Sequence, residues 1–126
     1  MDDEEAPEYE LHNLANDYYK LGDFMKAIEH YTKAISLKPD MIESYFNRGL
    51  AYTRINDFRK ALDDHTRVIE LKPDLAEVYY TRGLMHEYLK DYDSAVRDYS
   101  RAVELNPSYT EAREQKAIAL RKKTNT

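Results

Sequence analysis

Three prolines, Pro39, Pro73 and Pro107, lie 34 residues apart, and most of the sequence between them repeats with the same period. A fixed period of this length is typical of a stack of helical hairpins, in which each unit is too small to bury its own apolar face. Aligned on the prolines, the repeats run 8–41, 42–75 and 76–109. The period therefore predicts an all-α chain.

Each repeat contains two runs of apolar residues at spacings of three and four, which place a stripe on one face of a helix. The earlier run of the first repeat consists of Leu11, Leu14, Ala15, Tyr18 and Leu21. The later run consists of Phe24, Ala27, Ile28, Tyr31, Ala34, Ile35 and Leu37. Gly22 predicts the turn between them, and each proline ends the second helix because it cannot donate to the helical ladder.

Short polar residues mark where the helices begin. A carboxylate or hydroxyl in front of a helix can accept the N–H groups that its first turn leaves unpaired. The sequence predicts such caps for the second helix of each repeat at Asp23, Asp57 and Asp91. It predicts them for the helix after each proline at Asp40, Asp74 and Ser108.

Small residues predict a close approach of the paired helices. They occupy Ala15, Gly49 and Gly83 in the first helices, and Ala27, Ala61 and Ala95 in the second helices. Glycine inside a helix costs about 1 kcal/mol relative to alanine, so a packing reason is expected for both glycines. The arginines beside them, Arg48 and Arg82, are expected to reach a neighbouring carbonyl or carboxylate along an apolar stem. His65 and His86 are expected to be half-buried packing residues in aromatic positions.

The chain resembles the tetratricopeptide repeat family over residues 8–109. The family signature is a bulky residue, a Leu-Gly pair, an aromatic residue, Ala, an aromatic residue and Pro. The first repeat meets it with Leu11, Leu14, Ala15, Tyr18, Ala27, Tyr31 and Pro39. The others meet it with Tyr45, Gly49, Tyr52, Ala61, His65 and Pro73, and with Tyr79, Gly83, His86, Ala95, Tyr99 and Pro107. The resemblance implies a right-handed superhelical solenoid of antiparallel helix pairs.

The two ends of the chain differ in charge. Residues 1–7 predict an acidic, disordered tail, and six acids lie within the first ten residues. Residues 110–123 predict a seventh, capping helix, with an apolar side at Tyr109, Ala112, Ala117, Ile118 and Leu120. The basic residues near the C-terminus are Arg113, Lys116, Arg121, Lys122 and Lys123. Head-to-tail attraction between chains is therefore an alternative to a solvated tail and cap.

The composition argues against several classes of function. The chain has no cysteine, and none of its four histidines lies three or four residues from another, so no cofactor and no metal site are expected. Its three glycines form no phosphate-binding loop, and no catalytic cluster is found. The mean hydropathy is −0.84 and the pI is about 5.4. Neither membrane nor nucleic acid is an expected partner, and the cytoplasm is the default location.

In the family that this chain resembles, the first helices of successive repeats line a concave surface. The faces of those helices that do not carry the apolar stripe predict a peptide-binding groove. Its residues are Tyr9, His12, Asn13, Asn16, Tyr19, Lys20, Glu43, Phe46, Asn47, Leu50, Thr53, Arg54, Glu77, Tyr80, Thr81, Leu84, Glu87 and Tyr88. Phe46, Leu50, Tyr80 and Leu84 are expected to form an apolar strip, with tighter packing between repeats as the alternative.

Some chaperone adaptors of this family grip the terminal carboxylates of an acidic tail with five residues. Asn16 and Asn47 match this clamp, whereas His12, Glu77 and Thr81 occupy the positions of its Lys, Lys and Arg. The usual clamp is therefore not expected here. The charges favour a ligand with an acidic or polar group over the first two repeats and a basic group over the third.

The sequence thus predicts a protein–protein interaction module, an adaptor or scaffold of the co-chaperone kind, and not an enzyme. It would bind a peptide segment of a partner protein in its groove. Two alternatives remain open. One is a structural scaffold that assembles with itself, and the other is a regulatory domain of a larger protein.

Overall fold

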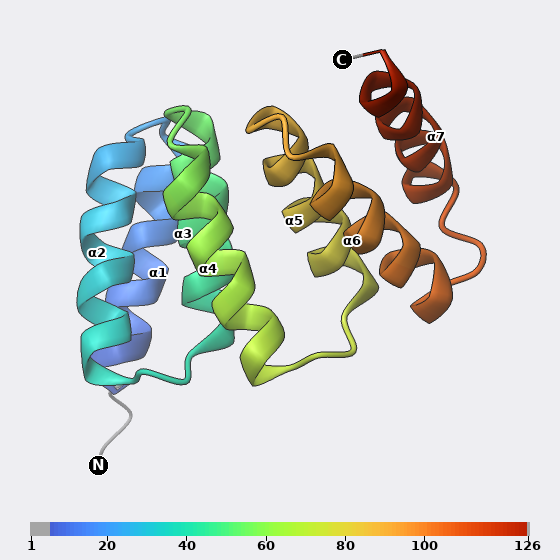
Figure 1. Ribbon diagram of the computed structural model, residues 1–126. Helices are drawn as coiled ribbons and strands as arrows, with labels where there is room; N and C mark the ends of the chain where they lie inside the picture. Colours follow the sequence, from blue (N-terminus) through green and yellow to red (C-terminus); the bar gives the residue numbers. More distant parts are fainter. Residues whose placement is uncertain (1–5, 126) are drawn as a thin grey trace. The chain divides into compact units, whose positions relative to one another are not determined.

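The computed structural model describes residues 6–125, which form seven α-helices and no strand (Figure 1). The helices are α1 (Pro7–Lys20), α2 (Phe24–Leu37), α3 (Ile42–Arg54), α4 (Phe58–Leu71), α5 (Ala76–Tyr88), α6 (Tyr92–Leu105) and α7 (Thr110–Thr124). The chain divides within α4 into two compact units. The N-terminal unit ends at Asp64, and the C-terminal unit starts at His65.

The turn inside each helix pair uses the same backbone device. Gly22 has a φ of 82°, and Asn56 and Lys90, one and two periods later, each have a φ of 64°. The next residue caps the following helix, as predicted. The carboxylates of Asp23, Asp57 and Asp91 accept from the backbone N–H groups of Lys26, Lys60 and Ser94, each at 3.2 Å.

The caps predicted at Asp40, Asp74 and Ser108 are wrong. Helices α3, α5 and α7 begin one residue later than those caps would require, and none has a side-chain cap. The reason is the turn that each proline starts. The N–H of Met41 bonds to the carbonyl of Lys38 at 3.1 Å, so Pro39 and Asp40 are the two central residues of a tight turn.

The N-terminal unit packs around small residues and one tyrosine. Ala15, Ala27 and Tyr31 form a buried cluster, against which Tyr18 and Tyr19 pack. Three residues expected in apolar stripes are instead exposed, namely Leu14, Leu21 and Leu37. Two of them lie at helix ends, where the helical period no longer fixes the direction of a side chain: Leu21 follows α1, and Leu37 is the last residue of α2.

The C-terminal unit has two buried clusters. One joins Tyr79, Ala102 and Ala112, and the other joins Ala95, Tyr99 and Ala119. The buried side of α7 is therefore formed by Ala112 and Ala119, which lie two turns apart. Ala117 and Leu120, predicted on that side, are exposed. The start of α1 at Pro7 places the last residue of the predicted tail in a helix, and residues 1–5 lie outside the described residues.

Two of the basic residues that suggested self-association have partners within the C-terminal unit. Lys122 lies 2.7 Å from a carboxylate oxygen of Glu87, and Lys123 lies 2.6 Å from one of Asp93. Head-to-tail association of chains stays a prediction.

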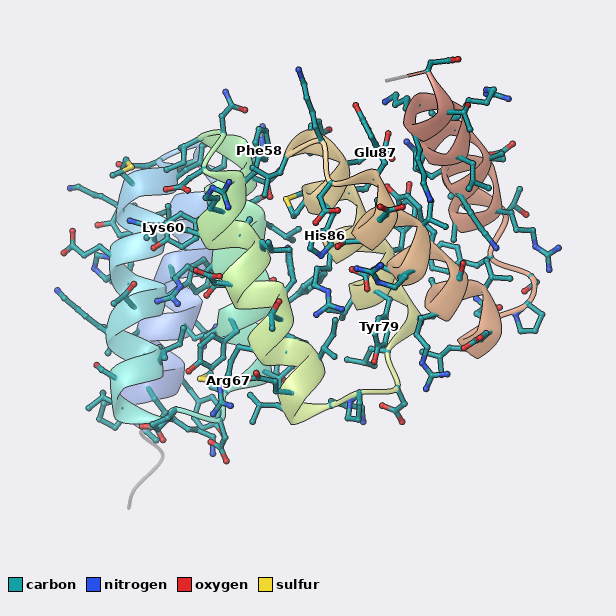
Figure 2. The ribbon with its side chains drawn as sticks, in the orientation of Figure 1. Phe58, Lys60, Arg67, Tyr79, His86 and Glu87 are labelled. Carbon is teal, nitrogen blue, oxygen red and sulfur yellow. The ribbon has the colours of Figure 1, made fainter. Side chains whose placement is uncertain are left out.

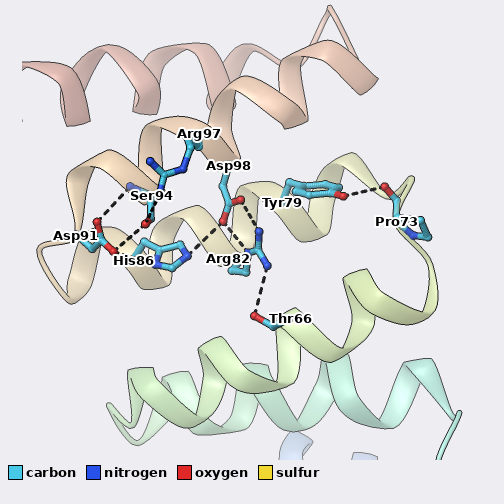
Figure 3. Close-up of polar contacts among 9 residues, drawn as sticks. All are labelled: Thr66, Pro73, Tyr79, Arg82, His86, Asp91, Ser94, Arg97 and Asp98. Carbon is cyan, nitrogen blue, oxygen red and sulfur yellow. Dashed lines mark hydrogen bonds and ion pairs between the residues drawn. The ribbon is translucent and has the colours of Figure 1, made fainter.

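Both arginines reach buried carboxylates, as predicted. Arg82 donates to the two oxygens of Asp98, each at 2.8 Å, and to the hydroxyl of Thr66 at 3.4 Å (Figure 3). In the N-terminal unit, one period earlier, Arg48 donates to Asp64 at 2.9 and 2.7 Å. The carboxylates of Asp64 and Asp98 are only 5% and 6% exposed. This two-pronged geometry offsets part of the desolvation of both charges. At Asp64 burial outweighs the contacts from Arg48 and raises the pKa of the carboxyl group.

The two histidines in aromatic positions differ. His65 is fully buried, not half-buried as predicted. His86 is half-buried, and its Nε2 lies 3.6 Å from a carboxylate oxygen of Asp98 (Figure 3).

Gly83 has the packing reason that the sequence predicted, and the atoms nearest to it belong to Tyr99. A Cβ atom at this position would lie 2.6 Å from Cε1 of Tyr99. Because Tyr99 is fully buried, its ring cannot swing away.

We therefore expect Gly83→Ala to destabilise the chain. Overpacking costs about 1–3 kcal/mol, whereas losing a helical glycine gains about 1 kcal/mol, so a net loss of up to about 2 kcal/mol is expected in urea unfolding. The same change in a Tyr99→Leu background, where the ring is absent, is the control. An equal loss in both backgrounds would show that the ring is not the cause.

Candidate functional site

A hollow of about 150 Å³ opens on the N-terminal unit. Its lining comes from α1, α2 and α3 and consists of Asn16, Tyr19, Lys20, Tyr31, Asn47 and Leu50. We call it the N-terminal hollow. All of these residues except Tyr31 are among the predicted groove residues, so the structure brings together side chains that the repeat pattern placed on α1 and α3.

A hydrogen-bonded trio forms part of its wall. The side-chain oxygen of Asn16 accepts from the hydroxyl of Tyr31 and, at 3.1 Å, from the amide nitrogen of Asn47. Because that oxygen already accepts twice, the Asn16 side chain offers donor hydrogens to a ligand. Burial raises the pKa of Tyr31 to about 12, so its hydroxyl stays neutral and keeps donating near pH 7.

The charge of the N-terminal hollow comes from Lys20, which is exposed at the end of α1. Tyr19 and Leu50 supply apolar surface beside it. The ammonium group and the amide donors complement a carboxylate, and the apolar wall suits the rest of a peptide. Arg54, also predicted here, is exposed, and its guanidinium lies 4.7 Å from the ring centre of Phe24.

His12 does not supply a second positive charge. Its Nδ1 lies 2.8 Å from the hydroxyl oxygen of the buried Ser44. Burial lowers the pKa of His12, and Glu43 only partly opposes this, so the ring is neutral near pH 7. The other predicted residues of this unit do not line the N-terminal hollow. Tyr9, Asn13 and Glu43 are exposed, and Phe46 and Thr53 are half-buried.

A second hollow, of about 250 Å³, lies on the C-terminal unit. It is lined by Leu84, Glu87 and Tyr88 of α5 and by Gln115 and Lys122 of α7. We call it the C-terminal hollow. Leu84, Glu87 and Tyr88 were predicted groove residues, whereas Gln115 and Lys122 were not. The period could have identified both, because Gln115 lies two periods after Asn47 and Lys122 lies three periods after Lys20.

Glu87 was predicted to line the groove, and it is buried. Its side chain, labelled in Figure 2, belongs to a residue that is only 8% exposed. The carboxylate accepts from Tyr99 at 2.8 Å, Gln115 at 3.1 Å and Lys122 at 2.7 Å. Burial by itself raises the pKa of Glu87, but the hydrogen bonds from these three donors outweigh it and lower the pKa. The carboxylate is therefore ionised near pH 7, and Lys122 balances its charge.

The remaining predicted residues of the C-terminal unit have mixed roles. Tyr80 packs with ring centres 5.8 Å from Tyr99 and 5.2 Å from Tyr109, so it supports the core. The hydroxyl of Thr81 donates to the backbone carbonyl of Glu77, and Glu77 is exposed. Removing Tyr80 would thus cost stability as well as any binding.

Within residues 6–125, no group of three or more His, Asp or Glu side chains could hold a metal ion. In the same part of the chain, none of the helices combines the length and the apolar character that crossing a bilayer demands.

The sequence matches two family models. One is described as TPR repeat and matches residues 15–55. The other is described as Tetratricopeptide repeat and matches residues 42–75 and 76–109. Among curated proteins, serine/threonine-protein phosphatase 5 from Homo sapiens and from Rattus norvegicus is 49% identical over 43 residues. That segment is 34% of this chain and only 9% of the length of either phosphatase.

Solved structures match nearly the whole chain. The first TPR of Spaghetti (RPAP3), bound to the HSP90 peptide SRMEEVD, has 29% identity and a TM-score of 0.85, over 91% of each chain. MamA has 26% identity and a TM-score of 0.89, over 93% of this chain and 68% of its own. The Arabidopsis OM64 TPR domain has 27% identity and a TM-score of 0.82, over 89% of this chain and 93% of its own. These matches confirm the all-α repeat fold predicted from the sequence.

Proposed function

The chain belongs to the tetratricopeptide repeat family, and from that premise we propose that its N-terminal hollow binds an acidic group of a peptide segment of another protein. The fold is typically a non-catalytic protein-interaction module, in which stacked helices present a surface to a partner. The proposed role is that of a co-chaperone-like adaptor. A cytoplasmic location and the absence of catalysis are part of the proposal.

One observation carries this proposal most directly. The paired amides of Asn16 and Asn47 lie in the same hollow as Lys20, and the oxygen of Asn16 is already used by two donors. The hollow therefore presents hydrogen-bond donors and a positive charge, which complement a carboxylate and repel a cation. A terminal carboxylate and an Asp or Glu side chain share this chemistry.

The RPAP3 domain supports an acidic ligand, because the peptide in that structure ends in Glu, Glu, Val and Asp. This chain differs where the family resemblance implies further cations. His12 is neutral, Glu77 has the opposite charge, and Thr81 bonds to its own helix. We therefore propose a ligand with its acidic group in the N-terminal hollow and a basic group at the third repeat.

We expect Lys20→Ala to weaken binding of a fluorescent peptide with an acidic, free C-terminus by about tenfold. The reason is the loss of the only ammonium group among the residues lining the N-terminal hollow. Fluorescence anisotropy would measure the change. Lys33→Ala is the matched control, because Lys33 lies on α2 and forms a surface pair with Glu29. Equal losses for the two variants would contradict the proposal.

Amidation of the peptide separates the two sources of the carboxylate. If the C-terminal carboxylate occupies the hollow, the amidated peptide loses the dependence on Lys20. If an Asp or Glu side chain occupies it, amidation leaves that dependence in place. A peptide with the reversed order of charges should bind more weakly than the original, and equal binding would contradict the proposed charge order.

A further inference from the structure

The C-terminal hollow holds a buried carboxylate whose balancing charge is not buried. The Glu87 side chain is 5% exposed, whereas the Lys122 side chain that pairs with it is 49% exposed. Tyr99 of α6 and Gln115 of α7 donate to the same carboxylate. Glu87 would therefore keep two donors if the Lys122 ammonium moved away.

The repeat pattern does not require an acidic residue at the position of Glu87. The equivalent residues one and two periods earlier are Thr53 and Tyr19. In the N-terminal unit the buried hydroxyl of Tyr31 is satisfied by a neutral amide, that of Asn16. A carboxylate is thus not needed to pair the hydroxyl of Tyr99, and packing alone does not explain the charge of Glu87.

The walls of the hollow suit a long basic side chain. Leu84 provides apolar surface for an aliphatic stem, and the ring of Tyr88 is 58% exposed beside it. Arginine and lysine bury such stems along apolar surface and place their charge on an aromatic face or a carboxylate. A volume of about 250 Å³ leaves room for one such side chain.

We propose that the C-terminal hollow is a binding subsite for an Arg or Lys side chain of a peptide, which takes the place of Lys122 on the Glu87 carboxylate. Lys122 then acts as an internal substitute for the ligand, and it keeps the buried charge paired while the subsite is empty. The inference rests on the proposed function for the rest of the peptide, and it assigns the basic group of that peptide to Glu87.

The test uses two peptides with the same acidic C-terminus, one carrying a single Arg and the other carrying citrulline, its neutral isostere, in the same place. In the full chain, Lys122→Met removes the competing charge and keeps the aliphatic stem. We expect it to raise affinity for the Arg peptide by about fivefold, because the free chain no longer fills its own subsite. Affinity for the citrulline peptide should not change.

Lys123→Met is the matched control, since it removes the same charge one residue later, from a surface pair with Asp93. If the two variants bind the Arg peptide equally, or if Lys122→Met leaves the ratio of Arg to citrulline affinity unchanged, the proposal is overturned and the cluster only holds α7 in place. Glu87→Gln should abolish the preference for Arg, and unfolding curves would show whether that variant folds.

The outcome also separates this inference from the proposed function. The effect of Lys20→Ala on the affinity for the citrulline peptide tests the N-terminal hollow alone. The ratio of the affinities for the Arg and citrulline peptides tests the Glu87 subsite alone. A ratio that responds to Lys122→Met without any dependence on Lys20 supports the subsite and contradicts the proposed function. No binding of the Arg peptide to Lys122→Met at millimolar concentration overturns the subsite.

Discussion

Replacing Arg82 with leucine is expected to lower the free energy of unfolding by about 3–5 kcal/mol. Arg82 donates two hydrogen bonds to Asp98, whose carboxylate is 6% exposed. Without the guanidinium, a buried charge loses its partner, and the nearby His86 can replace it only when protonated. In the wild-type chain burial lowers the pKa of His86, with Asp98 partly opposing this, so the ring is neutral near pH 7 and the pairing of Asp98 depends on Arg82.

Urea unfolding near pH 7 would measure this loss. The double variant Arg82→Leu/Asp98→Leu should recover most of it, because neither charge is then left unpaired in the core. Lys33→Ala, which breaks an exposed pair, should change stability by less than about 0.5 kcal/mol. A loss below about 1 kcal/mol for Arg82→Leu would contradict a structural role for the repeated Arg–Asp pair.

Acid is expected to destabilise the chain through His65 by about 3 kcal/mol. Burial, assisted by the charge of Arg82, lowers the pKa of His65 from its ordinary value of 6.5 to about 4. The unfolded chain takes up this proton near pH 6.5 and the folded chain only near pH 4. The folded state is therefore fully favoured above pH 6.5, loses stability as the pH falls through this window, and has lost the whole contribution below pH 4.

The variant His65→Phe isolates this contribution. It places at position 65 an aromatic ring like those of Tyr31 and Tyr99 at the equivalent positions of the other repeats, and phenylalanine cannot take up a proton. His12 and His86, whose pKa values burial also lowers, still titrate in the variant. The measurement is the difference between the wild-type and variant unfolding free energies at a series of pH values from 7 to 4. A difference that does not change with pH would contradict a buried, neutral His65.

The helices could be predicted from the sequence because three copies of one pattern agree. The aspartate before each second helix and the turn residue before it repeat at the same interval, so each copy supports the others. The predictions of caps after the prolines were wrong because the turn decides whether Asp40 or Met41 precedes α3. A sequence pattern alone does not fix the start of a helix to a single residue. The outward direction of Leu21 and Leu37 likewise depends on where a helix stops.

The candidate site was predictable only in part. Residues on the exposed faces of α1 and α3 follow from helical spacing, so Asn16, Asn47 and Leu50 were found. The pairing of Glu87 with Lys122 was not, because it joins α5 to a helix outside the repeat signature. The spacing of residues within one helix cannot show that its charged side chain pairs with a residue 35 positions later on another helix.

Binding of a carboxylate in the N-terminal hollow can be tested by a nuclear magnetic resonance titration of the ¹⁵N-labelled chain with the acidic peptide. We expect the largest changes in the side-chain amide signals of Asn16 and Asn47 and in the backbone signals of Lys20 and Leu50. We also expect Lys20→Ala to suppress these changes. Shifts confined to the exposed faces of α2 and α6, or none at millimolar peptide, would contradict carboxylate binding in this hollow.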